Sequence, residues 1–214
     1  QIDSTSTWAI LFWRSAGTLP VLFLFITLSS RGRPFASLRK AGIAGVIGGL
    51  GLVFAFAGSI YSMQATTIAN AVFLFSASPF FAAILGWLIL GERVRQATWA
   101  AIALAVAGMF IMVREGLSAG ALDGNIAALT SALGFAAFTI ALRWHRLEDM
   151  LPAILLGAAF SMVVAAGVQG VEGQSLMLSP RDIAISMALG GGIVGLGLSM
   201  YTLGSRVIPA AELT

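Results

Sequence analysis

Seven polar side chains lie inside long apolar runs of this sequence, where they could bind a small solute. They are Arg14, Asn70, Ser76, Ser78, Thr130, Ser199 and Tyr201. A polar group in hydrocarbon is costly unless it bonds to a neighbouring helix or faces water. Together these groups suit a weakly polar cavity, although each hydroxyl could equally be satisfied within the fold. We take all seven as candidate substrate-binding residues.

Arg14 and Asn70 each have two clear interpretations. Arg14 is the only charge well inside a complete apolar run. It could attract an anionic group of a solute, such as a carboxylate, or it could extend toward water or bond to backbone carbonyls. Asn70 could contact the solute, and the plainer interpretation is a hydrogen bond that joins two helices.

Two further residues could shape or charge a cavity within these runs. Pro79 lies in the middle of a run and predicts a helix kink, because proline lacks the N–H that the helix needs. The freed carbonyl could line a cavity, or neighbouring helices could simply tolerate the kink. Glu212 lies where the last apolar segment begins, and its carboxyl could couple transport to protons. The alternative is an acid in the first turn of a helix, where the helix dipole favours it.

Motifs of enzymes and cofactor sites are missing from the sequence. There is no cysteine, the one histidine is His145 in a basic loop, and no GxSxG, HExxH or Walker A pattern occurs. We therefore predict no catalytic residues, no metal and no cofactor. We attribute the net charge of +3 to basic loops on one side of a membrane rather than to a surface that binds nucleic acid.

The elements that carry these residues are predicted to be membrane-spanning helices. The chain is 58% hydrophobic and 10% charged, against about 25% charged in soluble domains. A span needs about 20 apolar residues, and barrel strands would alternate in polarity. The predicted helices cover 7–28, 41–63, 66–90, 97–113, 124–142, 150–168 and 183–203, and one more starts at 208.

The basic residues predict an orientation for these helices. Loops 29–40, 91–96, 143–149 and 204–207 hold nine of them, and the alternate loops hold two. By the positive-inside rule the four basic loops are cytoplasmic and Gln1 lies outside. Trp87, Trp99 and Trp144 lie near the cytoplasmic ends, as interfacial aromatic residues do.

An internal repeat relates the two halves of the chain. Ile47–Leu52 resembles Ile193–Leu198, and the glycine pair Gly45/Gly49 matches Gly191/Gly195 at the same offset. The offset spans five helices, an odd number, so the second copy would be inverted in the membrane. We expect residues 1–113 to form a first repeat that lacks one helix and residues 124–214 a truncated second one.

The sequence resembles the EamA-like transporters of the drug/metabolite transporter superfamily. The resemblance rests on Ala69-Asn70-Ala71, Ser78-Pro79-Phe80, Leu90-Gly91-Glu92-Arg93, Gly124–Leu129 and Ile208-Pro209. Trp13-Arg14 also resembles the arginine common near the start of the family's second helix. The resemblance implies an all-α polytopic integral membrane protein of ten helices in an inverted 5+5 repeat, with cytoplasmic termini.

The resemblance also implies a function. It points to alternating access around a central cavity and to export of amino acids or other small metabolites. Gly91, Glu92 and Arg93 would form a structural motif at a cytoplasmic helix end, with Glu92 paired to Arg93, Arg95 or a loop arginine rather than to a substrate. We expect a secondary transporter in a prokaryotic inner membrane, with a small solute and lipid as partners. The protein could form a homodimer. The alternative functions are a channel or facilitator, a membrane-embedded lipid-modifying enzyme, and a structural membrane protein.

Overall fold

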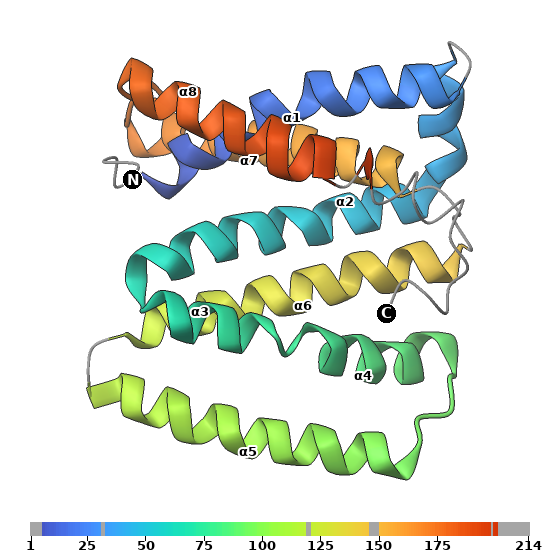
Figure 1. Ribbon diagram of the computed structural model, residues 1–214, viewed down its shortest axis with the longest axis vertical. Coiled ribbons are helices and arrows are strands. Elements are labelled where there is room, and N and C mark those ends of the chain that lie inside the picture. Colours follow the sequence, from blue (N-terminus) through green and yellow to red (C-terminus); the bar gives the residue numbers. More distant parts are fainter. Residues whose placement is uncertain (1–5, 31–32, 119–120, 146–149, 198, 201–214) are drawn as a thin grey trace.

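The apolar runs fold into helices that lie side by side along a common direction (Figure 1). A lipid-facing segment must satisfy its own backbone hydrogen bonds, and a helix does so within one segment. The computed structural model describes residues 6–30, 33–118, 121–145, 150–197 and 199–200, and only the backbone of 112–118. The elements are α1 (Thr7–Ser29), α2 (Pro34–Ala65), α3 (Ile68–Phe75), α4 (Ser78–Leu90), α5 (Gln96–Ser118), α6 (Leu122–Trp144), α7 (Leu151–Glu172), α8 (Pro180–Leu189) and the π-helix η1 (Gly190–Gly197).

Several of these helices are long and apolar enough to cross a membrane. Within the described residues they number five: Thr7–Ser29, Pro34–Ala65, Ile68–Leu90, Leu122–Trp144 and Leu151–Glu172. A shorter apolar stretch covers Gln96–Ile111 of α5. The protein is therefore a polytopic all-α membrane protein. Helices α5, α6 and α7 are longer than the predicted spans 97–113, 124–142 and 150–168, and residues from 201 onward lie outside the described part.

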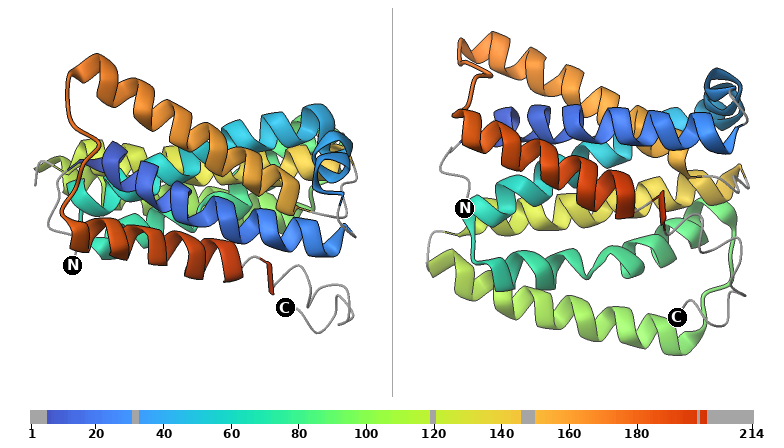
Figure 2. Two further views of the ribbon diagram at one scale, coloured as in Figure 1. Left: turned by 90° about the horizontal axis from the view of Figure 1, so that it is seen from above. Right: turned by 45° about the horizontal axis from the view of Figure 1, so that its top comes forward.

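The predicted loop 29–40 is wrong in its second part, because residues 34–40 are helical. Pro34 begins α2, where its fixed φ suits a first helical position. The expected start of the span, residue 41, lies next to Gly42, whose φ of 51° interrupts the helix. Only glycine adopts this conformation without strain. The first part of α2 consequently turns away from the direction of its long part (Figures 1 and 2).

The predicted span 66–90 is broken in the middle, where Pro79 predicts a kink. Helix α3 ends at Phe75, and α4 begins at Ser78 with Pro79 in its first turn. The N–H of Ser76 bonds to the carbonyl of Val72 at 3.1 Å, and the N–H of Phe80 bonds to that of Ala77 at 2.9 Å. The chain therefore ends one helix and starts another around the missing proline N–H.

The predicted α-helix over 183–203 is also incorrect in part. The described part of this segment is α-helical to Leu189, continues as η1 to Gly197 and is α-helical again at residues 199–200. Five glycines in η1 lower its preference for the α-helix and let its backbone approach α1 closely. A Cβ on Gly190 would lie 1.9 Å from the carbonyl oxygen of Arg14, so no larger residue fits there without movement.

Helix α2 is the central element, since it packs along both α6 and α7. A Cβ on Gly134 of α6 would lie 2.5 Å from the carbonyl oxygen of Gly51 of α2, which shows that the two backbones touch. On another side, Gly49 faces Gly157 and Phe160 of α7. The largest buried cluster joins α1, α2, α6 and α7 through Leu22, Ile26, Leu52, Phe138 and Ile154.

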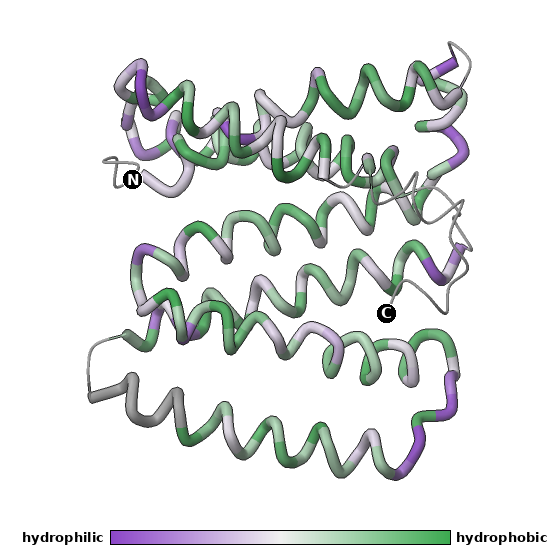
Figure 3. Tube along the Cα trace, viewed as in Figure 1, coloured by the Kyte–Doolittle hydropathy of each residue, from purple (hydrophilic) through white to green (hydrophobic). Residues whose placement is uncertain are grey.

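Hydrophilic residues lie at both ends of the helices (Figure 3), and those at one end, which we call the basic end, are mainly arginine and lysine. It is formed by the C-terminal ends of α1, α4 and α6 and the N-terminal ends of α2, α5 and α7. It carries Arg33, Arg39, Lys40, Arg93, Arg95 and Arg143. Trp87 and Trp99 lie there too, with ring centroids 5.5 Å apart. Asp123 and Glu172 lie at the opposite end.

Candidate functional site

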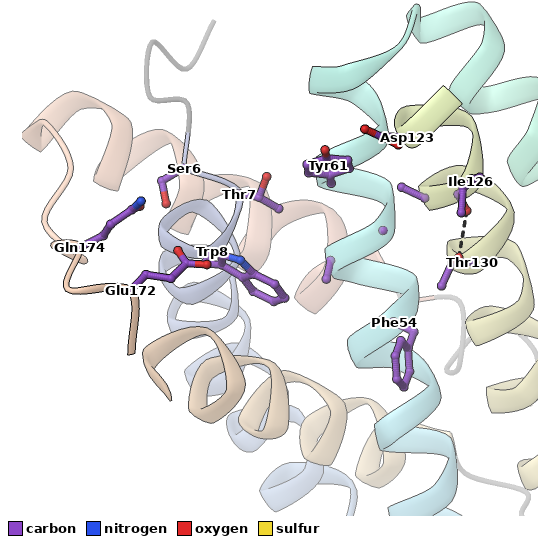
Figure 4. Close-up of a pocket in the computed structure, with 13 residues that line it drawn as sticks. Ser6, Thr7, Trp8, Phe54, Tyr61, Asp123, Ile126, Thr130, Glu172 and Gln174 are labelled. Carbon is purple, nitrogen blue, oxygen red and sulfur yellow. Dashed lines mark hydrogen bonds between the residues drawn. The ribbon is translucent and has the colours of Figure 1, made fainter. Parts of the chain in front are cut away.

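A cavity of about 560 Å³ opens between α1, α2, α6 and the end of α7, and we call it the Tyr61 cavity (Figure 4). It lies at the end opposite to the basic end. Its lining residues are Ser6, Thr7, Trp8, Phe54, Ala57, Gly58, Tyr61, Asp123, Ile126, Ala127, Thr130, Glu172 and Gln174. The volume is within the range of small-molecule sites.

Aromatic and hydroxyl groups form the walls of the Tyr61 cavity. Tyr61 and Phe54 project from α2, and Trp8 projects from the first turn of α1 (Figure 4). Thr130 lines the α6 wall, and its hydroxyl donates to the carbonyl of Ile126 at 2.9 Å. The oxygen of Thr130 can still accept a hydrogen bond from a bound molecule.

Two carboxylates contribute the charge of this cavity. Asp123 is in the first turn of α6, and Glu172 is at the C-terminal end of α7. Within the described residues no basic side chain lines the cavity. An electron-rich aromatic wall with two carboxylates attracts ammonium groups and repels anions.

Hydrogen bonds between helices hold the start of α1 at this cavity. Ser6 caps α1 by accepting from the N–H of Ala9, and it also accepts from Nε2 of the buried Gln169. The hydroxyl of Thr7 donates to Oε1 of Gln64 at 2.6 Å. Because these bonds reach α7 and α2, the α1 wall of the cavity is tied to both neighbours.

Asn70, which the sequence predicts as a substrate or packing residue, takes part in a chain of hydrogen bonds. Its Nδ2 donates to Oγ1 of Thr66 at 3.5 Å, and the hydroxyl of Thr66 donates to Oδ1 of Asn125 at 2.9 Å. Asn125 is fully buried in the first turn of α6. The chain joins the turn between α2 and α3 to α6, and Asn70 is not among the residues that line the Tyr61 cavity.

Ser76 and Ser78 have different surroundings, and Ser78 lines a cavity. The hydroxyl of Ser76 is exposed and donates to the carbonyl of Phe73 in its own helix. Ser78 and Pro79 line a second cavity of about 530 Å³ at the basic end, which we call the Arg93 cavity. Thr130 is not among its lining residues, so the structure does not bring these candidates into one site.

The segment Leu90–Arg93 forms a tight helix end. Gly91 caps α4 with a φ of 67°, and the N–H of Glu92 bonds back to the carbonyl of Gly86 at 3.2 Å. The carboxylate of Glu92 then pairs with Arg143 at the end of α6. The partner of Glu92 is therefore neither Arg93 nor Arg95 but Arg143, which lies in the last turn of α6 rather than in a loop. Arg93 lines the Arg93 cavity.

Arg14 lies inside the bundle, away from both cavities. Its guanidinium carbon is 4.7 Å from the centre of the Phe56 ring of α2. No carboxylate of the described part of the chain forms an ion pair with it. The contact is a cation–π interaction between α1 and α2. Ser199 is fully buried, and Tyr201 and Glu212 lie outside the described residues.

Sequence reasoning did not select Asp123, Glu172 and Gln174, which line the Tyr61 cavity. Asp123 and Glu172 lie outside the predicted spans 124–142 and 150–168, in positions where acidic residues are common in loops. The signal that could have found them is that both acids fall at helix ends on the same predicted side of the membrane.

Comparison with known proteins decides the family. The model of the EamA-like transporter family matches residues 1–114, which is more than half of the chain. The chain belongs to the EamA-like transporter family. This match contains Arg14, Asn70, Pro79 and the Gly91–Arg93 turn.

Curated relatives of this EamA-like chain are exporters. Two proteins named pseudopaline exporter CntI, from two strains of Pseudomonas aeruginosa, are each 32% identical to it over 139 residues. The aligned region is 63% of this chain and 46% of each relative. The chain therefore spans about half the length of the curated relatives it matches. No solved structure matches it.

Proposed function

We propose that the protein is a secondary transporter that exports small metabolites, such as amino acids or amphipathic compounds, by alternating access. The observation that carries the proposal is the Tyr61 cavity, which is large enough for a metabolite and is built by four helices. Membership of the EamA-like family and the resemblance to exporters support it.

The lining of the Tyr61 cavity favours a solute that carries an amino group. Asp123 and Glu172 would attract an ammonium group, and Tyr61 and Trp8 would contact it or an adjoining apolar part. Amino acids and amphipathic amines both have these features. A solute with negative charge alone would meet two carboxylates and no lining cation among the described residues.

We further propose that residues 1–113 and 124–214 belong to inverted repeats of a 5+5 arrangement. Support comes from the matching glycine pairs, because Gly45 and Gly49 of α2 face α7, while Gly191 and Gly195 of η1 face α1. If the helix that the first repeat lacks is counted, α2 and η1 are the third helices of the two repeats, and α1 and α7 are the second. Each glycine pair thus joins the third helix of one repeat to the second helix of the other. Such reciprocal contacts are expected of an inverted repeat around one axis.

The orientation that we propose places the basic end in the cytoplasm, with the membrane being a prokaryotic inner membrane. Arginine-rich turns and the exposed Trp87, Trp99 and Trp144 at that end support it. The Tyr61 cavity then opens on the outer side. For an exporter, an outward opening corresponds to the state that releases solute.

Counterflow in proteoliposomes containing the full-length protein tests this function. The expected result is saturable, accelerated exchange of amino acids or organic amines without ATP, and little exchange of organic anions. Flux that rises linearly with concentration would indicate a channel instead. A changed lipid in mass spectra would indicate an enzyme. Absence of exchange for every solute class, from protein that is folded, would refute transport of this kind.

A further inference from the structure

The Arg93 cavity lies at the basic end between α4, α6 and the turn that joins α4 to α5. Its volume is about 530 Å³. The lining residues are Ser78, Pro79, Ala82, Ala83, Glu92, Arg93, Val94, Arg95, Thr98, Phe135, Thr139 and Arg143. It shares no lining residue with the Tyr61 cavity.

The charge of the Arg93 cavity is positive. Three arginines and one glutamate line it. Glu92 is already paired with Arg143, so Arg93 and Arg95 supply the excess charge. Among the described residues neither of these two arginines forms an ion pair. Both are exposed, which leaves their guanidinium groups able to bind an anion.

Aromatic residues indicate that the mouth of this cavity lies at the membrane interface. Trp87 of α4 and Trp99 of α5 are 49% and 39% exposed and meet edge to face beside the turn. Exposed tryptophans at helix ends occupy the headgroup level of a bilayer. Arg93 and Arg95 therefore lie at the depth of lipid phosphates.

The interior of the cavity is mostly apolar. Ala82, Ala83 and Phe135 form part of its wall, and Pro79 and Val94 add further apolar surface. Thr98 lies at the arginine end, and the hydroxyl of Thr139 donates to the carbonyl of Phe135 at 3.0 Å. A ligand with an anionic head and an apolar chain fits this arrangement better than a free anion does.

We propose that the Arg93 cavity binds the headgroup of an anionic phospholipid. Arg93 and Arg95 hold the phosphate, and an acyl chain follows the apolar wall beside α4 and Phe135. Basic pockets between membrane helices on the cytoplasmic side recognise anionic lipids in this way. This site is separate from the solute cavity, so lipid binding does not depend on which solute the protein carries.

Native mass spectrometry of the full-length protein in neutral detergent tests the site. The probes are phosphatidylglycerol and phosphatidylcholine with the same acyl chains. We expect tighter binding of phosphatidylglycerol, and about a thirty-fold loss of its affinity in the double variant R93Q/R95Q, since each basic residue near the surface contributes on the order of a five-fold change. The matched control is R33Q/R39Q, which removes two exposed arginines of the basic end outside the cavity and should leave the affinity unchanged.

The proposal fails if phosphatidylcholine binds as well as phosphatidylglycerol, or if R93Q/R95Q and R33Q/R39Q behave alike. Competition separates a lipid from a soluble anion. Inorganic phosphate or glycerol phosphate at millimolar concentration should not displace phosphatidylglycerol. Displacement by either would assign the cavity to a free anion and overturn the lipid assignment.

Discussion

Glu92 at the end of α4 pairs with Arg143 at the end of α6, although 51 residues separate them. The Gly91 turn makes the pair possible, because its left-handed conformation folds Glu92 back over the last turn of α4. The pair thereby joins the ends of two helices that the chain connects only through α5.

Replacing Glu92 by glutamine should have a small effect on stability. The side chains of Arg143 and Glu92 are 52% and 41% exposed, so water screens the pair and its contribution should be below about 1 kcal/mol. Thermal unfolding in detergent of E92Q, R143Q and the double variant forms a mutant cycle that measures it. A coupling energy several times larger would show that the pair is shielded from water.

Replacing Gly91 by alanine should destabilise the end of α4 by about 1 to 2 kcal/mol, because a residue with a Cβ is strained at a φ of 67°. The measurement is the midpoint of thermal unfolding. Gly108→Ala in α5 is the control, since Gly108 has no unusual φ and open space around it. Equal effects of the two substitutions would contradict a turn-specific role of Gly91.

Replacing Gly134 by alanine should weaken the contact between α2 and α6. The added Cβ would lie 2.5 Å from the carbonyl oxygen of Gly51, so the helices must separate, at a cost of about 1 to 3 kcal/mol. The matched control is Gly167→Ala in α7, where nothing lies within 4 Å of the new atom. An unchanged unfolding midpoint for Gly134→Ala would show that this contact does not stabilise the fold.

Removing the charges of Asp123 and Glu172 should weaken transport of solutes that carry an amino group. We expect D123N and E172Q each to raise the apparent KM roughly three- to ten-fold, as loss of about 1 kcal/mol of attraction would do. A neutral analogue of the solute should be transported as before, which separates charge recognition from misfolding. Equal losses for charged and neutral solutes would contradict recognition of the amino group.

Much of the fold was predictable because it depends on local properties of the chain. The length of each apolar run sets whether it can cross a bilayer, and the arginines beside the runs sort them into two ends. The break before Pro79 follows from the missing N–H alone. The motif residues from Asn70 to Arg93, together with the internal repeat, indicated the EamA-like family, which the family match confirms.

Contacts between helices that are distant in the sequence could not be predicted from such local properties. Asp123 and Glu172 look like ordinary residues at helix ends, and only the packing of α6 and α7 around α2 brings them to one cavity with Tyr61. The same packing separates Thr130 from Ser78 and places Arg14 against Phe56. Close backbone contacts, such as that of Gly134 with Gly51, decide which face of a helix packs against its neighbour. These contacts depend on the partner helix as much as on the residue itself. The sequence by itself thus determined that the chain has several helices apolar enough to cross a membrane, whereas the tertiary structure decided which side chains share a cavity.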